Sequence, residues 1–313
     1  MPTIKKSVKF SGVGIHSGEP VNMVVRPFDA PGIFFRRVDI DGSNLIPGRF
    51  DNVGDTKMRN TTVGDLNGAH VKTIEHLMAA LFIAGIDSAL VEIDGPETPI
   101  LDGSAFDFYK KISGAGVLDG RRAKFIVKKT IIVHKREALR EVSFITRLKI
   151  FVMNLMSGRR DDGFVKLSPS DNGKMNIYAT LVYKEKIIGR QSFSYSFDNT
   201  KKSVDDFVEN VARARTFGKF SEWEYLKSHG MARGASEKNV IALNDNGDGT
   251  LNKTFWPDEF VRHKIIDLIG DMATSGGIII GNIESYKGSH ALNNILLKKL
   301  FSNPDNYDII LPK

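Results

Sequence analysis

Residues 72–85 read KTIEHLMAALFIAG, and this stretch predicts a helix that is packed on a core. Thr73 is placed to cap its start, and Gly85 is placed to end it. Glu75 and His76 lie together inside this otherwise apolar pattern. The apolar residues recur at helical spacing on one face, and they are Ile74, Leu77, Met78, Leu81 and Phe82.

A second strong helix is predicted over residues 258–275, and it places His263, Asp267 and Asp271 at intervals of four. One helical turn takes about 3.6 residues, so these three side chains lie on one stripe. Carboxylates on so apolar a helix need a partner if they are buried. A His and a carboxylate at this spacing can bind one metal ion together. From His263 and Asp267 alone, a surface ion pair is the favoured alternative.

Adding His76 changes this balance, because two His and one Asp form the three-ligand set of a catalytic zinc site with an open position. Glu75, the neighbouring carboxylate, would then be the base that activates the attacking water. This interpretation requires residues 76 and 263 to meet in space. It also predicts that the first long helix faces the second.

His290 opens a third predicted helix, over residues 290–301. It is either a simple helix-start residue or a protonated His that faces a developing oxyanion or a leaving amine. The other four His lie in turn-like or charged surroundings and are expected at the surface: His16, His70, His134 and His229.

Strands and helices alternate in two batches, and the predicted fold is α+β with two similar domains, residues 1–120 and 125–313. Each domain is expected to be a sheet with helices on one face. Further elements are predicted as a helix over 104–112, a strand over 124–134, a strand pair over 177–196, a helix over 203–215 and a buried strand over 278–280.

Composition restricts the function further. The chain has 313 residues, 41% hydrophobic and 26% charged, which is typical of a globular protein and excludes low-complexity disorder. It has no Cys, which excludes a disulfide scaffold, a thiolate zinc finger and a cysteine nucleophile.

The net charge of +7 suits an anionic partner. The N-terminus has no signal-peptide core, and no run of about 18 apolar residues occurs, so we expect a cytoplasmic protein.

Residues 135–160 form an unusual segment with seven basic and two acidic residues and with apolar residues at helical spacing. Peripheral contact of a basic amphipathic helix with an anionic membrane is one interpretation. A helix packed on its own domain is the favoured alternative. Nucleic acid is not expected as a partner, because no motif that reads RNA or DNA occurs.

Six stretches in one order resemble the UDP-3-O-acyl-N-acetylglucosamine deacetylase family, the zinc amidases of lipid A biosynthesis in Gram-negative bacteria. Together they span almost the whole chain, and they are GVGIHSGEPV (12–21), KTIEHLMAAL (72–81), GPETPILDGSA (95–105), ARTFG (214–218), FVRHKIIDLIGD (260–271) and SYKGSHALNN (285–294). The resemblance implies two domains, each a sheet with two helices, and an active site between the facing helices.

The resemblance also implies the role of each residue. His76, His263 and Asp267 match the zinc ligands, for which iron(II) is a possible substitute. The matching catalytic residues are Glu75 as general base, His290 as general acid and oxyanion stabiliser, Asp271 as its partner and Thr216 as a hydroxyl near the reacting carbonyl. The matching substrate residues are Lys264 and Lys287 for the anionic part, Phe217, Phe220 and Trp223 for the acyl passage, and Tyr183, more loosely, near the uridine.

The expected substrate is therefore an anionic UDP-acyl-sugar, and a monomer is expected. A hydrolase acting on a different acylated amine keeps the same chemistry and stays as an alternative. The chain departs from the family pattern at residues 135–163, where a short acidic turn between two strands is expected. It also has Lys-Gly-Ser-His before the last helix instead of Lys-Ser-Gly-His. By residue type alone, the three aromatic residues of the acyl passage are ordinary core side chains, and Thr216 is a helix-end hydroxyl.

Overall fold

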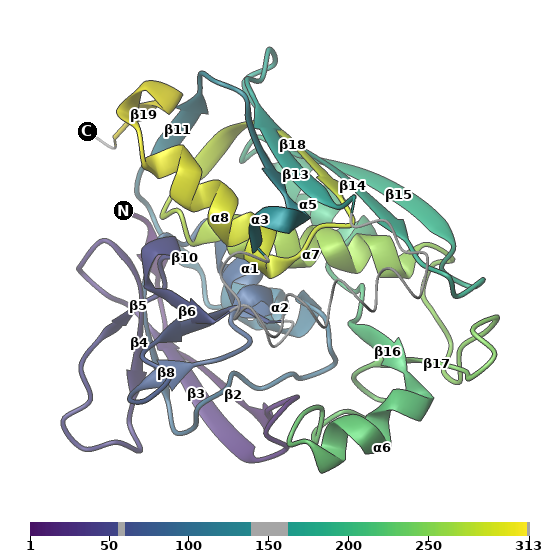
Figure 1. Ribbon diagram of the computed structural model, residues 1–313. Helices are drawn as coiled ribbons and strands as arrows, with labels where there is room; N and C mark the ends of the chain where they lie inside the picture. The colour runs from purple at the N-terminus through teal and green to yellow at the C-terminus, as the bar shows by residue number, and fades with distance from the viewer. Residues whose placement is uncertain (56–59, 139–161, 312–313) are drawn as a thin grey trace.

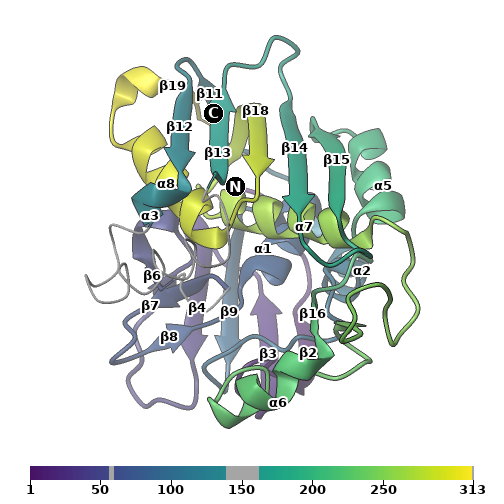
Figure 2. The same cartoon turned by 45° about the vertical axis from the view of Figure 1, so that its right-hand side comes forward.

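Two seven-stranded sheets, one from each half of the chain, form the outer layers of the protein. The computed structural model describes residues 1–55, 60–138 and 162–311. Figures 1 and 2 show helices from both halves between the two sheets. The α+β fold with two sheet-and-helix halves is thereby confirmed. No feature of the structure tests the predicted domain boundary between residues 120 and 125, which stays a prediction.

The first sheet has the strand order β10-β1-β9-β3-β2, with β4 on β9 and β5 on β4. Its inner face is apolar because alternate residues of each strand point to the same side. A smaller sheet, β6-β7-β8, lies in the same half. The strands are β1 (Thr3–Ile4), β2 (Val8–Val13), β3 (Pro20–Arg26), β4 (Gly32–Arg37), β5 (Ile46–Pro47), β6 (Val53–Asp55), β7 (Thr62–Gly64), β8 (His70–Val71), β9 (Ser88–Ile93) and β10 (Val117–Leu118).

The second sheet has the order β12-β13-β18-β11-β19, with β14 on β18 and β15 on β14. A two-stranded sheet of β16 and β17 is separate from both large sheets (Figure 1). The strands are β11 (Lys124–Val127), β12 (Ile131–His134), β13 (Phe164–Ser168), β14 (Met175–Val182), β15 (Arg190–Phe197), β16 (Phe217–Lys219), β17 (Ile241–Leu243), β18 (Ile278–Tyr286) and β19 (Tyr307–Ile310).

Two helices dominate the layer between the sheets, and each is buried along most of its length. Every residue of α1 is buried, as are thirteen of the fifteen residues of α7. The helices are α1 (Glu75–Ile83), α2 (Phe106–Gly114), α3 (Lys135–Ala138), α5 (Lys201–Asn210), α6 (Phe220–Ser228), α7 (Glu259–Ala273) and α8 (His290–Phe301), with the 3₁₀ turns η1 (Phe50–Asn52) and η3 (Pro304–Asn306).

A close approach of backbones fixes how α1 and α7 pack. A Cβ atom at Gly270 would lie only 2.0 Å from the backbone oxygen of Glu75. No side chain fits there, so the glycine lets the start of α1 lie directly on the last third of α7. This contact sets how the side chains at the start of α1 face those along α7, where the candidate site lies.

Several sequence-based boundaries need correction. The helix predicted at 290–301 is confirmed by α8, whereas the strand predicted at 124–134 is two strands, β11 and β12. The helix predicted at 203–215 ends at Asn210, and the strand predicted at 278–280 continues to Tyr286. The predicted cap at Thr73 is wrong: its backbone has a φ of 58°, and its hydroxyl donates to Glu97 at 2.8 Å.

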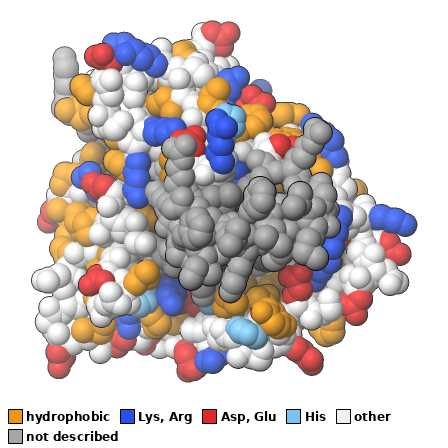
Figure 3. Space-filling model, in the orientation of Figure 1, with side chains coloured by type: hydrophobic (Ala, Val, Ile, Leu, Met, Phe, Trp, Pro, Cys, Tyr) orange, Lys and Arg blue, Asp and Glu red, His pale blue; other side chains and the backbone are white. Residues whose placement is uncertain are grey.

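The basic segment predicted to be helical lies mostly outside the described residues, at positions 139–161. Residues 135–138 form the short helix α3. On the face in Figure 3, Lys and Arg side chains are interspersed with acidic ones, so positive charge on that face is not confined to one patch. Within the described ranges, no helix is both long and apolar enough to cross a membrane.

Candidate active site

Helices α1 and α7 bring His76, His263 and Asp267 together, as the sequence analysis required. The Nε2 atom of His263 lies 3.3 Å from Oδ1 of Asp267, and the Nε2 atom of His76 lies 3.6 Å from the same oxygen. The two imidazole rings meet edge to face, with centroids 4.9 Å apart. All three side chains are buried, and their ligand atoms lie within 4.8 Å of one another.

The imidazole of His263 is held in one orientation and in the neutral state. Its Nδ1 lies 3.0 Å from the carbonyl oxygen of Ala214, to which it donates a hydrogen bond. Burial lowers the pKa of His263 to about 3, and the Asp267 carboxylate opposes this shift only in part. Since the hydrogen is on Nδ1, the lone pair of Nε2 faces Asp267.

The Asp267 carboxylate divides its two oxygens between different partners. Oδ2 accepts a hydrogen bond from Nζ of Lys264 at 2.5 Å, and Oδ1 faces the two imidazoles. Burial alone would raise the pKa of Asp267, but its neighbours, first of all the charge of Lys264, outweigh burial and hold the pKa well below the usual value. Burial likewise works against the charge of Lys264, yet Asp267 raises its pKa. Asp267 is therefore ionised, with one oxygen directed at both His side chains.

The three side chains of this cluster are suited to bind a divalent cation. The Nε2 atom of neutral His263 and Oδ1 of Asp267 are both acceptors, so no hydrogen bond joins them at 3.3 Å. A cation between them would satisfy both atoms together with Nε2 of His76. Two imidazole nitrogens and one carboxylate oxygen are the protein ligands of many catalytic zinc sites.

Glu75 and His290 lie next to this cluster and face each other. Oε1 of Glu75 is 3.9 Å from Nε2 of His290, and Oε2 accepts a hydrogen bond from the backbone N–H of Thr61 at 3.0 Å. Burial raises the pKa of Glu75, although the positive charge of His290 acts in the opposite direction. Raising the pKa of a carboxylate makes it a stronger base near neutral pH.

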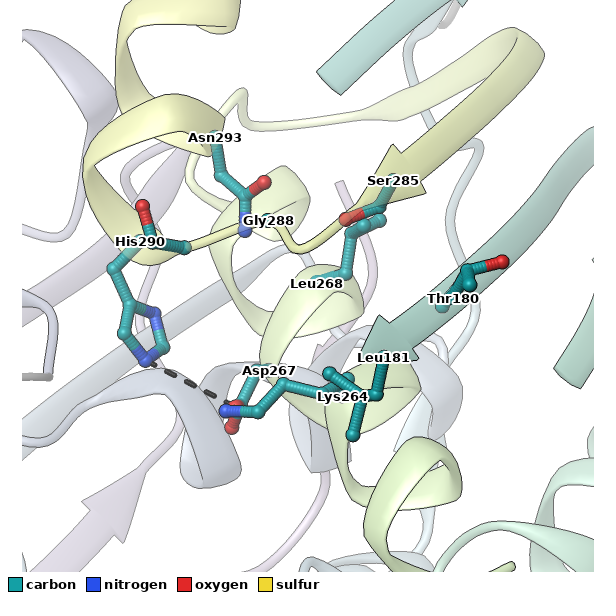
Figure 4. Close-up of a pocket in the computed structure, with 11 residues that line it drawn as sticks. Thr180, Leu181, Lys264, Asp267, Leu268, Ser285, Gly288, His290 and Asn293 are labelled. Atoms are coloured by element: carbon teal, nitrogen blue, oxygen red, sulfur yellow. Dashed lines mark hydrogen bonds and ion pairs between the residues drawn. The ribbon is translucent and has the colours of Figure 1, made fainter. Parts of the chain in front are cut away.

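His290 is the first residue of α8, and it is held by the carboxylate of Asp271. Its Nδ1 donates to Oδ2 of Asp271 at 2.7 Å, which directs Nε2 toward Glu75 and Asp267. Figure 4 shows the contact with Asp267. Burial disfavours the charged imidazole, but Asp271 and Glu75 outweigh burial and raise the pKa of His290 to about 10. His290 is therefore protonated at neutral pH, whereas His263 is neutral.

A small pocket opens beside these groups, between α7, α8 and the strands β14 and β18. It is lined by Lys264, Asp267, Ser285 and His290, among others (Figure 4). Lys264 extends along the pocket to Asp267, and its ammonium group lies 5.7 Å from the ring centre of Phe217. The pocket thus combines the Lys264 ammonium group, the protonated imidazole of His290 and one of the three candidate metal ligands, Asp267.

The aromatic residues singled out in the sequence are divided between two places. Phe217 lies near the cluster, with its ring 6.4 Å from that of His263, and Tyr183 packs against Phe217 at 5.8 Å. Phe220 is 44% exposed on α6. Trp223 is buried in a separate small core with residues such as Val240 and packs against Phe220 at 5.2 Å.

Two further predicted residues make contacts that do not reach the cluster. Thr216 is half-buried, and its backbone N–H donates to Gly103 at 2.9 Å. Lys287 pairs with Asp162 at 2.6 Å. Two of the His expected at the surface, His16 and His70, are half-buried, which corrects that expectation, whereas His134 and His229 are exposed.

The sequence analysis missed two groups that hold Asp271. The hydroxyl of Thr61 donates to Oδ1 at 2.6 Å, and the side-chain amide of Asn293 donates to Oδ2 at 2.8 Å. Asn293 lies three residues after His290 on α8, so helical spacing could have identified it. No spacing in the sequence relates Thr61 to Asp271, which is 210 residues away.

Comparison with known proteins gives the same family as the motifs. A model of the family UDP-3-O-acyl N-acetylglycosamine deacetylase matches residues 1–302. The chain belongs to this deacetylase family. UDP-3-O-acyl-N-acetylglucosamine deacetylase of Geotalea uraniireducens is 37% identical over 311 residues, which cover 98% of this chain and 90% of that protein. The deacetylases of Neisseria meningitidis serogroup A and Geobacter sp. strain M21 are each 36% identical, over 98% of this chain and 91% of theirs.

The chain is therefore an enzyme, a deacetylase that acts on an amide, and its family is metal-dependent. In this deacetylase, His76, His263 and Asp267 are the one group of three possible metal-ligating side chains found among the described residues. This cluster is therefore the candidate metal site of the deacetylase.

Proposed function

We propose that this enzyme hydrolyses the N-acetyl amide of a UDP-3-O-acyl-N-acetylglucosamine, releasing acetate and the free amine, with zinc held by His76, His263 and Asp267. Iron(II) accepts the same ligands and is the alternative metal. The observation that carries the proposal is the meeting of one ionised carboxylate and two imidazoles beside a second, more basic carboxylate. When bound, the cation supplies Lewis acidity, which makes water a nucleophile near neutral pH.

Glu75 is the general base in this proposal. Its Oε2 is occupied by the N–H of Thr61, so Oε1 is the atom available to take a proton from the attacking water. Burial raises its pKa, which brings its basicity closer to that needed at neutral pH. The carboxylate receives one proton when water attacks the acetyl carbonyl carbon.

His290 is the general acid and the main side-chain donor to the oxyanion. With Nδ1 fixed on Asp271, its Nε2–H is free to face the developing negative charge, and it can then protonate the leaving nitrogen as the C–N bond breaks. Thr216 adds a hydroxyl donor in this proposal. Asp271 orients the imidazolium and keeps it charged.

The remaining residues bind the substrate. Lys264, and Lys287 near the end of β18, supply positive charge for the diphosphate of the UDP group. Tyr183 packs on Phe217 near His263 and offers an aromatic surface for the uridine. Phe217, Phe220 and Trp223 offer apolar surface for the acyl chain, and the exposed Phe220 would lose contact with water when that chain binds.

The enzyme is proposed to act in the cytoplasm as a monomer. Its substrate carries a charged diphosphate, which does not cross a bilayer unaided, so enzyme and substrate must share a compartment. Contact of residues 135–160 with an anionic membrane remains part of the proposal. Vesicle binding by the whole enzyme and by a variant lacking that segment tests it.

Two variants test the catalytic proposal by separating metal binding from turnover. Asp267→Ala is expected to lose both the metal and the release of free amine from the UDP-acyl-sugar. Glu75→Gln is expected to keep the metal and lose about 100-fold or more in kcat. Asp245→Ala, at an exposed carboxylate, is the control and should behave as the wild type. A Glu75→Gln enzyme with normal turnover contradicts the assignment of the base.

A further inference from the structure

Thr61 touches both groups that handle protons in the proposed reaction. Its backbone N–H donates to Oε2 of Glu75 at 3.0 Å. Its hydroxyl donates to Oδ1 of Asp271 at 2.6 Å and lies 3.3 Å from Nδ1 of His290. Its carbonyl oxygen accepts a hydrogen bond from the N–H of Ile74, the residue before Glu75, at 3.3 Å. The side chain is buried, with 3% exposure.

These contacts connect the two halves of the enzyme. Thr61 and Glu75 belong to the first half, whereas Asp271 is on α7 and His290 is on α8 in the second. Asp271 is held by three donors: Thr61 on Oδ1, and His290 and Asn293 on Oδ2. Because Thr61 is the donor on Oδ1 that comes from the other half, it fixes the plane of this carboxylate relative to Glu75.

We propose that Thr61 is a positioning residue that couples the two proton-handling groups, fixing the Glu75 carboxylate through its backbone and the Asp271–His290 pair through its hydroxyl. The inference rests on the proposed function. The N–H contact leaves Oε1 of Glu75 as the oxygen that faces Nε2 of His290, at 3.9 Å. The hydroxyl keeps Asp271 from rotating, so His290 keeps its Nε2 directed at the same point.

Removal of the hydroxyl is predicted to impair turnover more than binding. In Thr61→Val the side chain keeps its branched shape, but Oδ1 of Asp271 loses its donor. Loss of a hydrogen bond to a charged group lowers the rate by about 10- to 100-fold when the bond is needed only in the chemical step. We expect kcat to fall by that factor, with KM changed by less than about threefold and metal content unchanged.

Two further variants separate positioning from a merely structural effect. Thr61→Ser restores the hydroxyl and is expected to keep kcat within about threefold of the wild type. Thr62→Val removes the next hydroxyl along the chain, which is equally buried but donates to Asn60 at 3.3 Å instead, and it should keep normal kcat. An equal fall in kcat for Thr61→Ser and Thr61→Val, or for Thr62→Val, overturns the inference.

A double-mutant cycle tests the coupling through Asp271 directly. If the hydroxyl acts through this carboxylate, adding Thr61→Val to Asp271→Asn should lower kcat by less than about threefold beyond Asp271→Asn alone. A full additional fall overturns the inference. Glu75→Gln and Asp271→Asn alone report on the proposed function: normal turnover in both would end that proposal. If Glu75→Gln and Asp271→Asn both lose turnover while Thr61→Val has normal turnover, only the role of Thr61 is refuted.

Discussion

His290 and Asp271 form a buried ion pair, with Nδ1 and Oδ2 separated by 2.7 Å, between the two sheets. The equally buried His263 is neutral because burial lowers its pKa further than the Asp267 carboxylate raises it, and its Nδ1 donates to a backbone carbonyl. The two imidazoles thus differ in charge: His290 has a carboxylate on Nδ1, whereas His263 has an uncharged carbonyl there. One is suited to a proton donor and the other to a metal ligand.

The pH profile should report on this pair. In the proposed mechanism deacetylation needs protonated His290, so activity should fall as pH rises through its pKa, about 10 in the wild type. In Asp271→Asn the anion is lost while burial remains, so the pKa of His290 drops. We expect the alkaline limb of kcat against pH to move to lower pH by more than one unit, alongside a lower maximum. Asp245→Asn is the control, and an unmoved alkaline limb contradicts the prediction.

Much of the site could be predicted from the sequence because it is built on helices. Helical spacing relates His263, Asp267 and Asp271, so their common face follows from residue numbers alone. The approach of His76 to them could not be derived from spacing, since it depends on Gly270 bringing α1 onto α7. Family resemblance supplied that step.

The features that the sequence analysis did not predict depend on contacts between distant segments of the chain. Thr73 has the right residue type for a cap, but its hydroxyl bonds to Glu97, and the local rule for helix starts therefore fails. Strand β18 was predicted too short because after Gly281 its residues alternate between buried and half-buried, whereas its first three are apolar. Thr61 carries no local signal at all.

Removal of the metal should destabilise the folded enzyme. The cluster buries an ionised carboxylate and two imidazoles. A cation that binds only the folded state raises the free energy of unfolding by about 2.7 kcal/mol when its free concentration is about 100 times its Kd. We expect the apparent Tm to fall after treatment with a chelator and to recover on addition of Zn²⁺. In His76→Ala the chelator should cause no further fall, and a chelator-sensitive Tm in that variant counts against the assigned ligands.

A second buried ion pair anchors the segment before β16, whose Ala214 carbonyl orients His263. Oε1 of Glu259 accepts from the guanidinium of Arg215 at 2.9 Å and from its backbone N–H at 3.1 Å, next to the Ala214 carbonyl. Glu259→Ala leaves the Arg215 cation buried without its carboxylate, so the free energy of unfolding in urea should fall by about 3–5 kcal/mol. Glu224→Ala, at an exposed carboxylate of α6, should change it by less than about 0.5 kcal/mol. A loss below about 1 kcal/mol for Glu259→Ala contradicts this account.

The contact between α1 and α7 should tolerate no side chain at position 270. A Cβ atom there would overlap the backbone oxygen of Glu75, so Gly270→Ala must separate the two helices and move His76 away from the pair on α7. We expect weaker metal binding in a chelator competition and a loss of about 10-fold or more in kcat, since small displacements of catalytic groups are costly. Gly114→Ala is the matched control, because Gly114 ends α2 with no neighbour near its Cβ position. There alanine should stabilise the helix slightly or change nothing. Gly270→Ala with normal metal affinity would mean that the helix contact does not set the geometry of the site.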